Sequence, residues 1–213
     1  METNRKNERE NWRVKVLVGE DRLDIRRRML FARSMIANPR QVGAVWPTSR
    51  RAVCDLLDMS DLSRAEVALE FGVGTGVYTA QILRRLSPEA RLLALEVDGA
   101  IAELTAQRLP DRRLTVIKDS AERAGEYLGG EHADAVVSSL PFTTLPHPVG
   151  RDILDLVPRI LAPDGAFLVL QYSRGIEADL EERFASVERI LSPLNVPPAF
   201  LYRCMAPIRP GKS

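Results

Sequence analysis

The segment that most constrains this chain is a glycine-rich stretch at residues 70–76, with the sequence EFGVGTG. It follows an apolar run, 67–69, and precedes a stretch with helical patterning, 77–86. Closely spaced glycines allow a tight strand-to-helix turn in which backbone N–H groups approach a ligand. Glu96 closes the next apolar run, where a carboxylate can accept hydrogen bonds from two ribose hydroxyls. The pattern therefore predicts a turn that binds a nucleoside-bearing cofactor.

The spacing of this turn selects among such cofactors. Its glycines follow G-x-G-x-G, whereas dinucleotide-binding turns follow G-x-G-x-x-G. Glu70 heads the turn, where a carboxylate would repel a pyrophosphate but suits the charged amino-acid tail of S-adenosylmethionine. The arrangement favours S-adenosylmethionine over NAD and resembles the turn of class I methyltransferases.

Apolar runs and helical patterning alternate along the chain after residue 48. The expected strands are 67–71, 92–96, 114–118, 133–138 and 166–171, with Gly165 as the turn into the last of them, and the expected helices between them are 77–86, 100–107, 121–127 and 149–161. A helix at 178–184 and an antiparallel pair of strands, 186–191 and 199–205, follow. This alternation is typical of an α/β fold. We expect a Rossmann-like sheet of seven strands, as in class I methyltransferases.

Candidate cofactor contacts fall at consecutive strand ends, where ligands bind in such sheets. The three glycines cover the methionine portion, Glu70 holds its ammonium, Glu96 takes the ribose hydroxyls, and Asp119 accepts from the adenine amino group. Asp98 is better placed as a helix N-cap. The predicted cofactor-binding set is Val45, Pro47, Ser49, Glu70, Gly72, Gly74, Thr75, Gly76, Glu96, Val97, Asp119, Ser120 and Ser138.

The turn at 138–142, SSLPF, follows the fourth expected strand, where methyltransferases hold the methyl acceptor. It aligns with the Asn-x-Pro-Tyr/Phe motif of adenine N6-methyltransferases, but Ser139 stands where Asn would be. A hydroxyl cannot reproduce the two contacts of a carboxamide, which counts against adenine as the acceptor.

Charge is distributed unevenly along the chain. Residues 1–51 hold 13 Lys/Arg and 6 Asp/Glu, whereas the remaining 162 residues hold 17 and 23. We expect a helix from about Trp12 to Ala37, which carries an arginine stripe bordered by apolar residues and is ended by Pro39. The predicted domains are therefore a basic helical membrane-association arm at 1–38 and a methyltransferase domain at 39–213.

Four segments resemble the bacterial phospholipid N-methyltransferases. They are NPRQVGAVWPTS at 38–49, the glycine turn, SSLPF at 138–142, and the pair QYSRG at 171–175 and NVPPAFLYR at 195–203. The resemblance implies an enzyme that methylates phosphatidylethanolamine and its mono- and dimethyl forms towards phosphatidylcholine. It also implies a peripheral protein on the inner face of the cell membrane, attached to anionic lipid by its N-terminal helix.

On the acceptor side, the predicted catalytic residues are Ser138, Ser139, Leu140, Tyr172 and Arg174. Tyr172 and Arg174 are the first choice for binding the lipid phosphate, and Tyr202 and Arg203 the second. No metal site is expected, because the chain has only two histidines and its two cysteines, Cys54 and Cys204, lack metal-ligand spacing. Both cysteines are expected to be reduced and buried in a cytosolic protein.

Three other functions remain open at this stage. The basic arm also suits a nucleic-acid methyltransferase, although Ser139 and the acidic body do not, so no nucleic-acid partner is expected. A small-molecule methyltransferase could use the arm as a lid over its site. A non-catalytic module could bind cofactor and membrane for regulation. The expected partners are an anionic membrane surface and a phospholipid substrate, with a monomer favoured.

Overall fold

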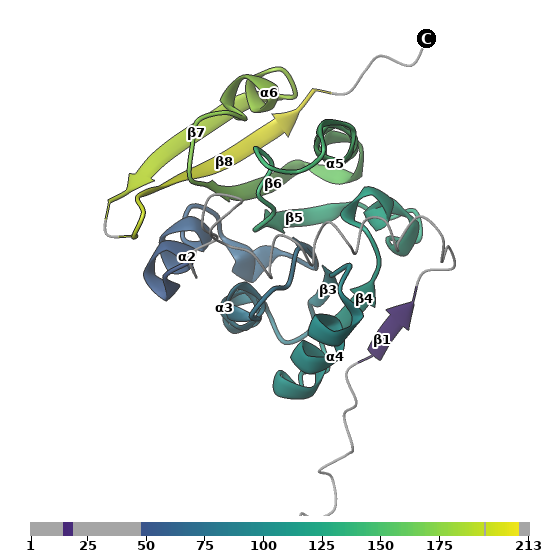
Figure 1. Cartoon of the computed structure of the whole chain (residues 1–213). Helices are drawn as coiled ribbons and strands as arrows, with labels where there is room; N and C mark the ends of the chain where they lie inside the picture. The colour runs from purple at the N-terminus through teal and green to yellow at the C-terminus, as the bar shows by residue number, and fades with distance from the viewer. Residues whose placement is uncertain (1–14, 19–47, 194, 209–213) are drawn as a thin grey trace, which may run out of the picture.

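An eight-stranded sheet organises the chain (Figure 1). The computed structural model describes residues 15–18, 48–193 and 195–208. The strand order is β1-β4-β3-β2-β5-β6-β8-β7, and every neighbouring pair up to β6 is parallel, whereas β8 runs antiparallel to both β6 and β7. The strands are β1 (Lys15–Val18), β2 (Val67–Phe71), β3 (Arg91–Leu95), β4 (Leu114–Lys118), β5 (Ala133–Ser138), β6 (Leu161–Gln171), β7 (Phe184–Ser192) and β8 (Ala199–Pro207).

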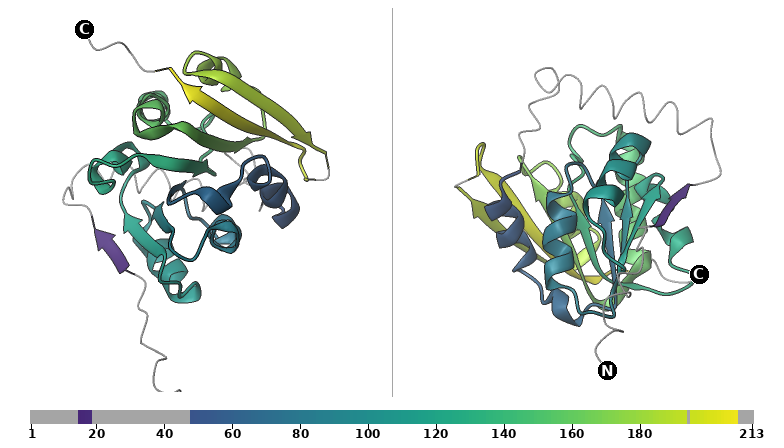
Figure 2. Two further views of the ribbon diagram at one scale, coloured as in Figure 1. Left: turned by 180° about the vertical axis from the view of Figure 1, so that it is seen from behind. Right: turned by 90° about the horizontal axis from the view of Figure 1, so that it is seen from below.

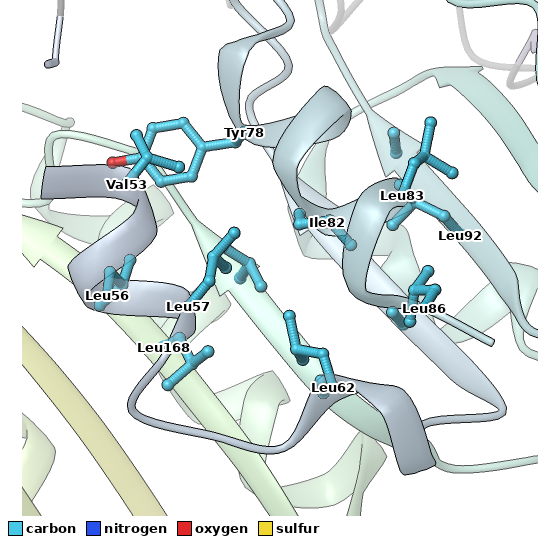
Figure 3. Packing of buried hydrophobic residues seen from close by; sticks show 14 of the residues in the cluster. Val53, Leu56, Leu57, Leu62, Tyr78, Ile82, Leu83, Leu86, Leu92 and Leu168 are labelled. Carbon is cyan, nitrogen blue, oxygen red and sulfur yellow. The ribbon is translucent and has the colours of Figure 1, made fainter. Parts of the chain in front are cut away.

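Helices cover both faces of this sheet (Figure 2). The helices are α2 (Arg50–Leu57), η1 (Leu62–Arg64), α3 (Val77–Arg85), α4 (Gly99–Arg108), η2 (Ala121–Tyr127), α5 (His147–Ile160) and α6 (Glu177–Glu181). The apolar faces of α2, α3 and α4 pack in one cluster, part of which Figure 3 shows, and η2, α5 and α6 pack in a second. All five residues of β2 are buried, because a central parallel strand is covered on both faces.

Most of the expected elements are present. The strands 67–71, 114–118 and 133–138 have the expected bounds, and the antiparallel pair near the C-terminus is confirmed. The N-cap expected at Asp98 is also confirmed, since its side chain accepts from the Ala100 and Ile101 N–H groups at the start of α4. At the start of α2, the Ser49 side chain accepts from the Ala52 N–H in the same way.

The number of strands differs from the prediction of seven. Lys15–Val18 was expected within a helix, but it forms β1, which pairs in parallel with β4 at the edge of the sheet. Valine and leucine in this segment fit a pleated edge, and the partner strand is about a hundred residues away, so local patterning could not reveal the pair. The rest of the expected arm lies outside the described residues, and the domain boundary at 38 stays a prediction.

Three smaller differences have local causes. Residues 121–127 form a 3₁₀ rather than an α-helix. β6 begins at Leu161 rather than 166, because an irregularity brings Leu161 opposite Ala133 and Ala166 opposite Ala135, and Gly165 lies inside it. Phe184 begins β7 instead of ending the preceding helix, and α6 stops at Glu181.

The two cysteines were expected to be reduced and buried. Cys54 and Cys204 are both free thiols; Cys204 is buried as expected, whereas Cys54 is only partly buried. No helix in the described ranges combines the length and the apolar character needed to cross a bilayer.

Candidate functional site

The carboxyl ends of β2, β3, β4 and β5 meet at one edge of the sheet, because these strands are parallel. Backbone bonds continue the pairing past the strand ends: Gly72 N–H donates to the Leu95 carbonyl, Glu96 N–H to Ile117, and Ser139 N–H to Phe71. This edge, which we call the donor edge, therefore gathers the glycine turn, Glu96, Asp119 and the 138–142 turn.

The glycine turn needs its glycines for backbone conformation and for space. Gly72, Gly74 and Gly76 have φ of +81°, +51° and +78°, a region that L side chains rarely adopt. A Cβ on Gly72 would lie 3.0 Å from the Leu140 side chain. A Cβ on Gly74 would meet nothing within 4 Å. The turn thus packs against the 138–142 turn at Gly72 and leaves open space at Gly74.

Glu70 is the most unusual group at the donor edge. Its side chain is fully buried at the end of β2, and one carboxylate oxygen accepts a hydrogen bond from the Thr79 hydroxyl at 3.0 Å. The other oxygen, Oε2, has no partner among the described residues. Desolvation raises the pKa of Glu70 to about 8; repulsion from the nearby charge of Glu96 adds to this shift, and the hydrogen bond from Thr79 opposes it. A buried acceptor without a donor is costly, so this oxygen suits a ligand ammonium.

Glu96 follows β3, and its carboxylate is hydrogen-bonded to the backbone of the glycine turn. Its Oε2 accepts from the Gly74 N–H at 3.1 Å, and its Oε1 accepts from the Asp98 N–H at 3.0 Å. Burial raises the pKa of this carboxyl, while the two N–H donors oppose the shift. Each oxygen keeps a second lone pair, which fits the prediction that ribose hydroxyls donate here.

Asp119 lies at the carboxyl end of β4 and is almost completely buried. Its Oδ1 accepts from the Ser120 N–H at 2.8 Å, and its Oδ2 accepts from the Tyr127 hydroxyl at 2.6 Å. Arg123 lies 3.3 Å from the same Oδ2. The Ser120 hydroxyl donates to Glu122. The position of Asp119 agrees with the prediction. Its Oδ2 is already bonded to Tyr127 and paired with Arg123, so the adenine amino group would donate to Oδ1, which also accepts from the Ser120 N–H.

The 138–142 turn is fixed by three hydrogen bonds. The Ser138 hydroxyl accepts from the Leu140 N–H at 3.2 Å, and the Ser139 hydroxyl donates to the Gly72 carbonyl at 2.7 Å. Gln171, at the end of β6, donates from its side chain to the Leu140 carbonyl at 2.7 Å. Gln171 belongs to the QYSRG motif, but no site role was predicted for it, because that role depends on contact with a turn 31 residues earlier. The acceptor turn is thereby tied to both the glycine turn and β6.

A group of hydroxyls lies beside Glu70. The Tyr172 hydroxyl lies 3.2 Å from the Thr48 hydroxyl. The Tyr78 hydroxyl, at the start of α3, is buried and has no hydrogen-bond partner in the described part of the chain. Burial raises its pKa, and Thr48, Tyr172 and Glu70 are near enough to affect that pKa as well. Sequence reasoning missed Tyr78, since an aromatic residue at this helix position is usually core.

The predicted phosphate-binding residues differ in exposure and in their partners. Arg174 is exposed and forms an ion pair with Glu177 at 2.6 Å, and Glu177 also pairs with Arg189. Of the second choices, Tyr202 is fully buried, and Arg203 donates to the Met59 carbonyl at 2.9 Å while it pairs with Glu188. Only Tyr172 and Arg174 follow the carboxyl end of β6 directly.

The remaining predicted residues have mixed placements. Thr75 is exposed within the glycine turn, Val97 follows Glu96 and is partly buried, and Ser49 is the N-cap of α2. Val45 and Pro47 lie outside the described residues.

Taken together, the donor edge fits the expected S-adenosylmethionine. Open space at Gly74, an unpartnered buried carboxylate oxygen on Glu70 and free lone pairs on Glu96 match the methionine, ammonium and ribose portions. All of these groups belong to the glycine turn and to the two carboxylates beside it.

Comparisons with known proteins agree with this geometry. The family model described as a methyltransferase domain matches residues 68–165. An ornithine lipid N-methyltransferase from Singulisphaera acidiphila is 34% identical over 145 residues, which cover 66% of this chain and 76% of that protein. The ubiquinone/menaquinone biosynthesis C-methyltransferase UbiE from Idiomarina loihiensis is 26% identical over 127 residues, which cover 59% of this chain and 50% of that protein.

A solved structure supports the fold. The N-methyltransferase NodS from Bradyrhizobium japonicum WM9, in complex with S-adenosyl-L-homocysteine, is similar with a TM-score of 0.64 and 18% identity, and the match covers 84% of this chain and 98% of that one. The sheet, the glycine turn and the extended match to the ornithine lipid enzyme lead to one conclusion. This chain belongs to the class I S-adenosylmethionine-dependent methyltransferases.

Proposed function

We propose that this protein transfers methyl groups to the amine of phosphatidylethanolamine, and of its mono- and dimethyl forms, towards phosphatidylcholine at a membrane surface. The observation that carries the lipid part is the 34% identity to an ornithine lipid N-methyltransferase. The motifs at 38–49, 171–175 and 195–203 favour a phospholipid amine among the lipid acceptors. An ornithine lipid is the second candidate acceptor, and the same relative is the observation in its favour.

When bound, S-adenosylmethionine supplies an electrophilic methyl on its sulfonium. The task of the protein is to hold the amine nitrogen in line with that methyl and sulfur. The turn at 138–142 suits this task, since its hydrogen bonds to Gly72 and Gln171 fix it between the glycine turn and β6. A rigid turn in contact with the donor-binding loop would set the approach of the nitrogen.

The acceptor amine must be neutral to react, whereas a primary ammonium in water titrates near 10, by analogy with lysine. Burial at the donor edge and the positive sulfonium both disfavour a charged amine. The buried hydroxyl of Tyr78 and the partly buried hydroxyl of Tyr172 offer acceptors for the N–H groups of a neutral primary or secondary amine.

The lipid phosphate needs donors close to the acceptor turn. Tyr172 and Arg174 follow β6 directly. The Arg174 guanidinium uses its Nε for Glu177, and its terminal nitrogens, which make no hydrogen bond to the described residues, could donate to a phosphate. The exposed position of Arg174 suits a group that meets a headgroup at the surface.

Membrane attachment through the N-terminal arm is part of the proposal. Residues 1–51 carry an excess of seven positive charges, which would favour anionic lipid. Each exposed arginine would contribute roughly 1 kcal/mol, and the attraction would weaken with salt. The cell location that follows is cytoplasmic and peripheral on the inner face of the membrane.

One experiment separates the acceptor classes. Methyl-labelled S-adenosylmethionine is incubated with the protein and vesicles of phosphatidylethanolamine, vesicles that contain ornithine lipid, RNA, or buffer alone, and the label is counted in each extracted fraction. Label in the phosphatidylethanolamine fraction supports the proposal. Label confined to ornithine lipid identifies the second acceptor, and label transferred to RNA with none in either lipid overturns a lipid function.

A further inference from the structure

The hairpin between β7 and β8 lies at the donor edge of the sheet. Gln171, the last residue of β6, is opposite Phe200, and Ser192 is opposite Ala199. Because β8 is antiparallel to β6, residue 193 and residues 195–198, which we call the turn, lie past the carboxyl end of β6. In Figures 1 and 2 this hairpin lies along the outer side of the sheet, with its turn end close to α2.

The turn is fixed in place by a buried polar residue. Asn195 is almost completely buried; its Oδ1 accepts from the Ser49 N–H at 3.0 Å and its Nδ2 donates to the Pro197 carbonyl at 2.7 Å. Ser49 begins α2 and is next to Thr48, whose hydroxyl lies beside that of Tyr172. The hairpin turn is therefore bonded to the segment that carries Thr48, one of the hydroxyl-bearing residues of the candidate site.

This turn exposes apolar side chains on both of its faces. Six large apolar side chains of the described residues are exposed, and three of them, Ile190, Leu191 and Val196, are in this hairpin. Ile190 and Leu191 are consecutive in β7, so they point to opposite faces of the ribbon. Leu191 is 50% exposed and Val196 70% exposed. Ser192, Asn195 and Ala199 are buried where the turn packs on the protein, so these apolar side chains lie on the part of the tip that faces away from it.

Single exposed apolar residues are common, but a hairpin at the edge of a sheet normally carries charges that prevent edge association. Here the charges lie beside the tip and are basic. Arg50 and Arg51 are exposed in the first turn of α2, directly after Ser49. Cations are unfavourable at a helix N-terminus, so these two arginines do not stabilise α2 through its dipole. They suit an anionic partner.

We propose that the tip of the β7–β8 hairpin, defined by Ile190, Leu191 and Val196, inserts into the headgroup layer of a lipid bilayer. An apolar tip flanked by arginines is the pattern of interfacial membrane contacts. The contact would turn the donor edge towards the membrane, where an amine headgroup could enter it. The inference rests on the proposed lipid function and adds a second membrane contact, built into the folded domain rather than the N-terminal arm.

The test measures membrane partition of the full-length protein. The double variant Leu191→Ser/Val196→Ser is compared with Leu104→Ser, which removes a leucine of similar exposure (43%) from α4. Vesicles contain equal parts of phosphatidylcholine and phosphatidylglycerol, at a salt concentration high enough to screen the arm. We expect the double variant to partition about tenfold more weakly and the control to match the wild type.

A second readout reports insertion directly. Val196→Cys, in a Cys54→Ser background that leaves only the buried Cys204, carries an environment-sensitive dye. The dye at 196 should shift to the blue on addition of these vesicles, and the same dye on Leu104→Cys should not.

Unchanged partition of the double variant, or a dye at 196 that stays in water, overturns the inference. A change in the sedimentation of the lipid-free protein with no change in partition would assign the tip to contact between copies and also overturn it. Neither readout depends on methyl transfer, so failure of the phosphatidylethanolamine assay would be seen separately. Titration with S-adenosylhomocysteine checks that each variant is folded.

Discussion

We predict that Glu70 couples binding of the donor to release of a proton. Without ligand, one oxygen of its buried carboxylate has no partner among the described residues, and its pKa is raised to about 8. At pH 7 the side chain is therefore about nine-tenths protonated. The ammonium of the donor favours the ionised form, so binding should expel that proton.

The magnitude follows from this pKa. Below pH 8, the dissociation constant of S-adenosylhomocysteine should fall by about tenfold for each unit of pH increase, provided that the pKa in the complex is low. Above pH 8 it should level off. In the free protein the sign is the reverse: the native state holds a proton between 4.5 and about 8 that the unfolded chain loses, so the free energy of unfolding falls as the pH rises through this window.

Calorimetry in buffers with different ionisation enthalpies measures the protons released. At pH 7 the observed binding enthalpy should vary with buffer enthalpy with a slope that corresponds to about 0.9 proton. Glu70→Gln keeps the shape of the side chain but cannot titrate, so the slope should vanish and the affinity should fall. Glu66→Gln, at the exposed opposite end of β2, is the matched control and should behave as the wild type. A slope that persists in Glu70→Gln would refute the reasoning.

Three further substitutions test individual groups of the site. Tyr78→Phe removes a buried hydroxyl without a described partner, so the free energy of unfolding should stay equal or rise by about 1 kcal/mol while the donor dissociation constant increases; lower stability with unchanged binding would contradict this. Ser139→Ala removes the bond to the Gly72 carbonyl and should cost about 1 kcal/mol in urea unfolding, with weaker donor binding; an unchanged midpoint would show that this bond is not needed. Arg174→Ala should raise the lipid concentration needed for half-maximal methyl transfer and leave donor binding intact, and equal losses in both would exclude phosphate contact as its role.

The core of the fold could be predicted from the sequence because its strands are continuous apolar runs. β2, β4 and β5 are buried between helices, so their ends coincide with the ends of those runs. The glycine turn was equally visible, since positive φ at Gly72, Gly74 and Gly76 restricts the residue type. Where local chemistry dictates structure, the prediction was confirmed.

Other features depend on contacts that spacing does not reveal. β1 was predicted as helix because its pairing with β4 is long-range. The site roles of Tyr78 and Gln171 were not predicted because they come from burial and from a distant carbonyl, although Gln171 is in the QYSRG motif. The unpartnered oxygen of Glu70 is likewise a property of the packed structure, although its position beside the glycine turn was predicted.

The most direct test of the account is donor binding at Gly74. Its Cβ position faces open space, so Gly74→Ala should weaken S-adenosylhomocysteine binding through the ligand. Gly129 is the matched control: it also has positive φ (+62°) and nothing within 4 Å of a Cβ, but it lies in the loop before β5, at the opposite edge of the sheet. Both alanines should lower stability by similar small amounts, about 1 kcal/mol. The account predicts that calorimetry shows tight binding for wild type and Gly129→Ala and much weaker binding for Gly74→Ala; equal affinities for the two variants would contradict it.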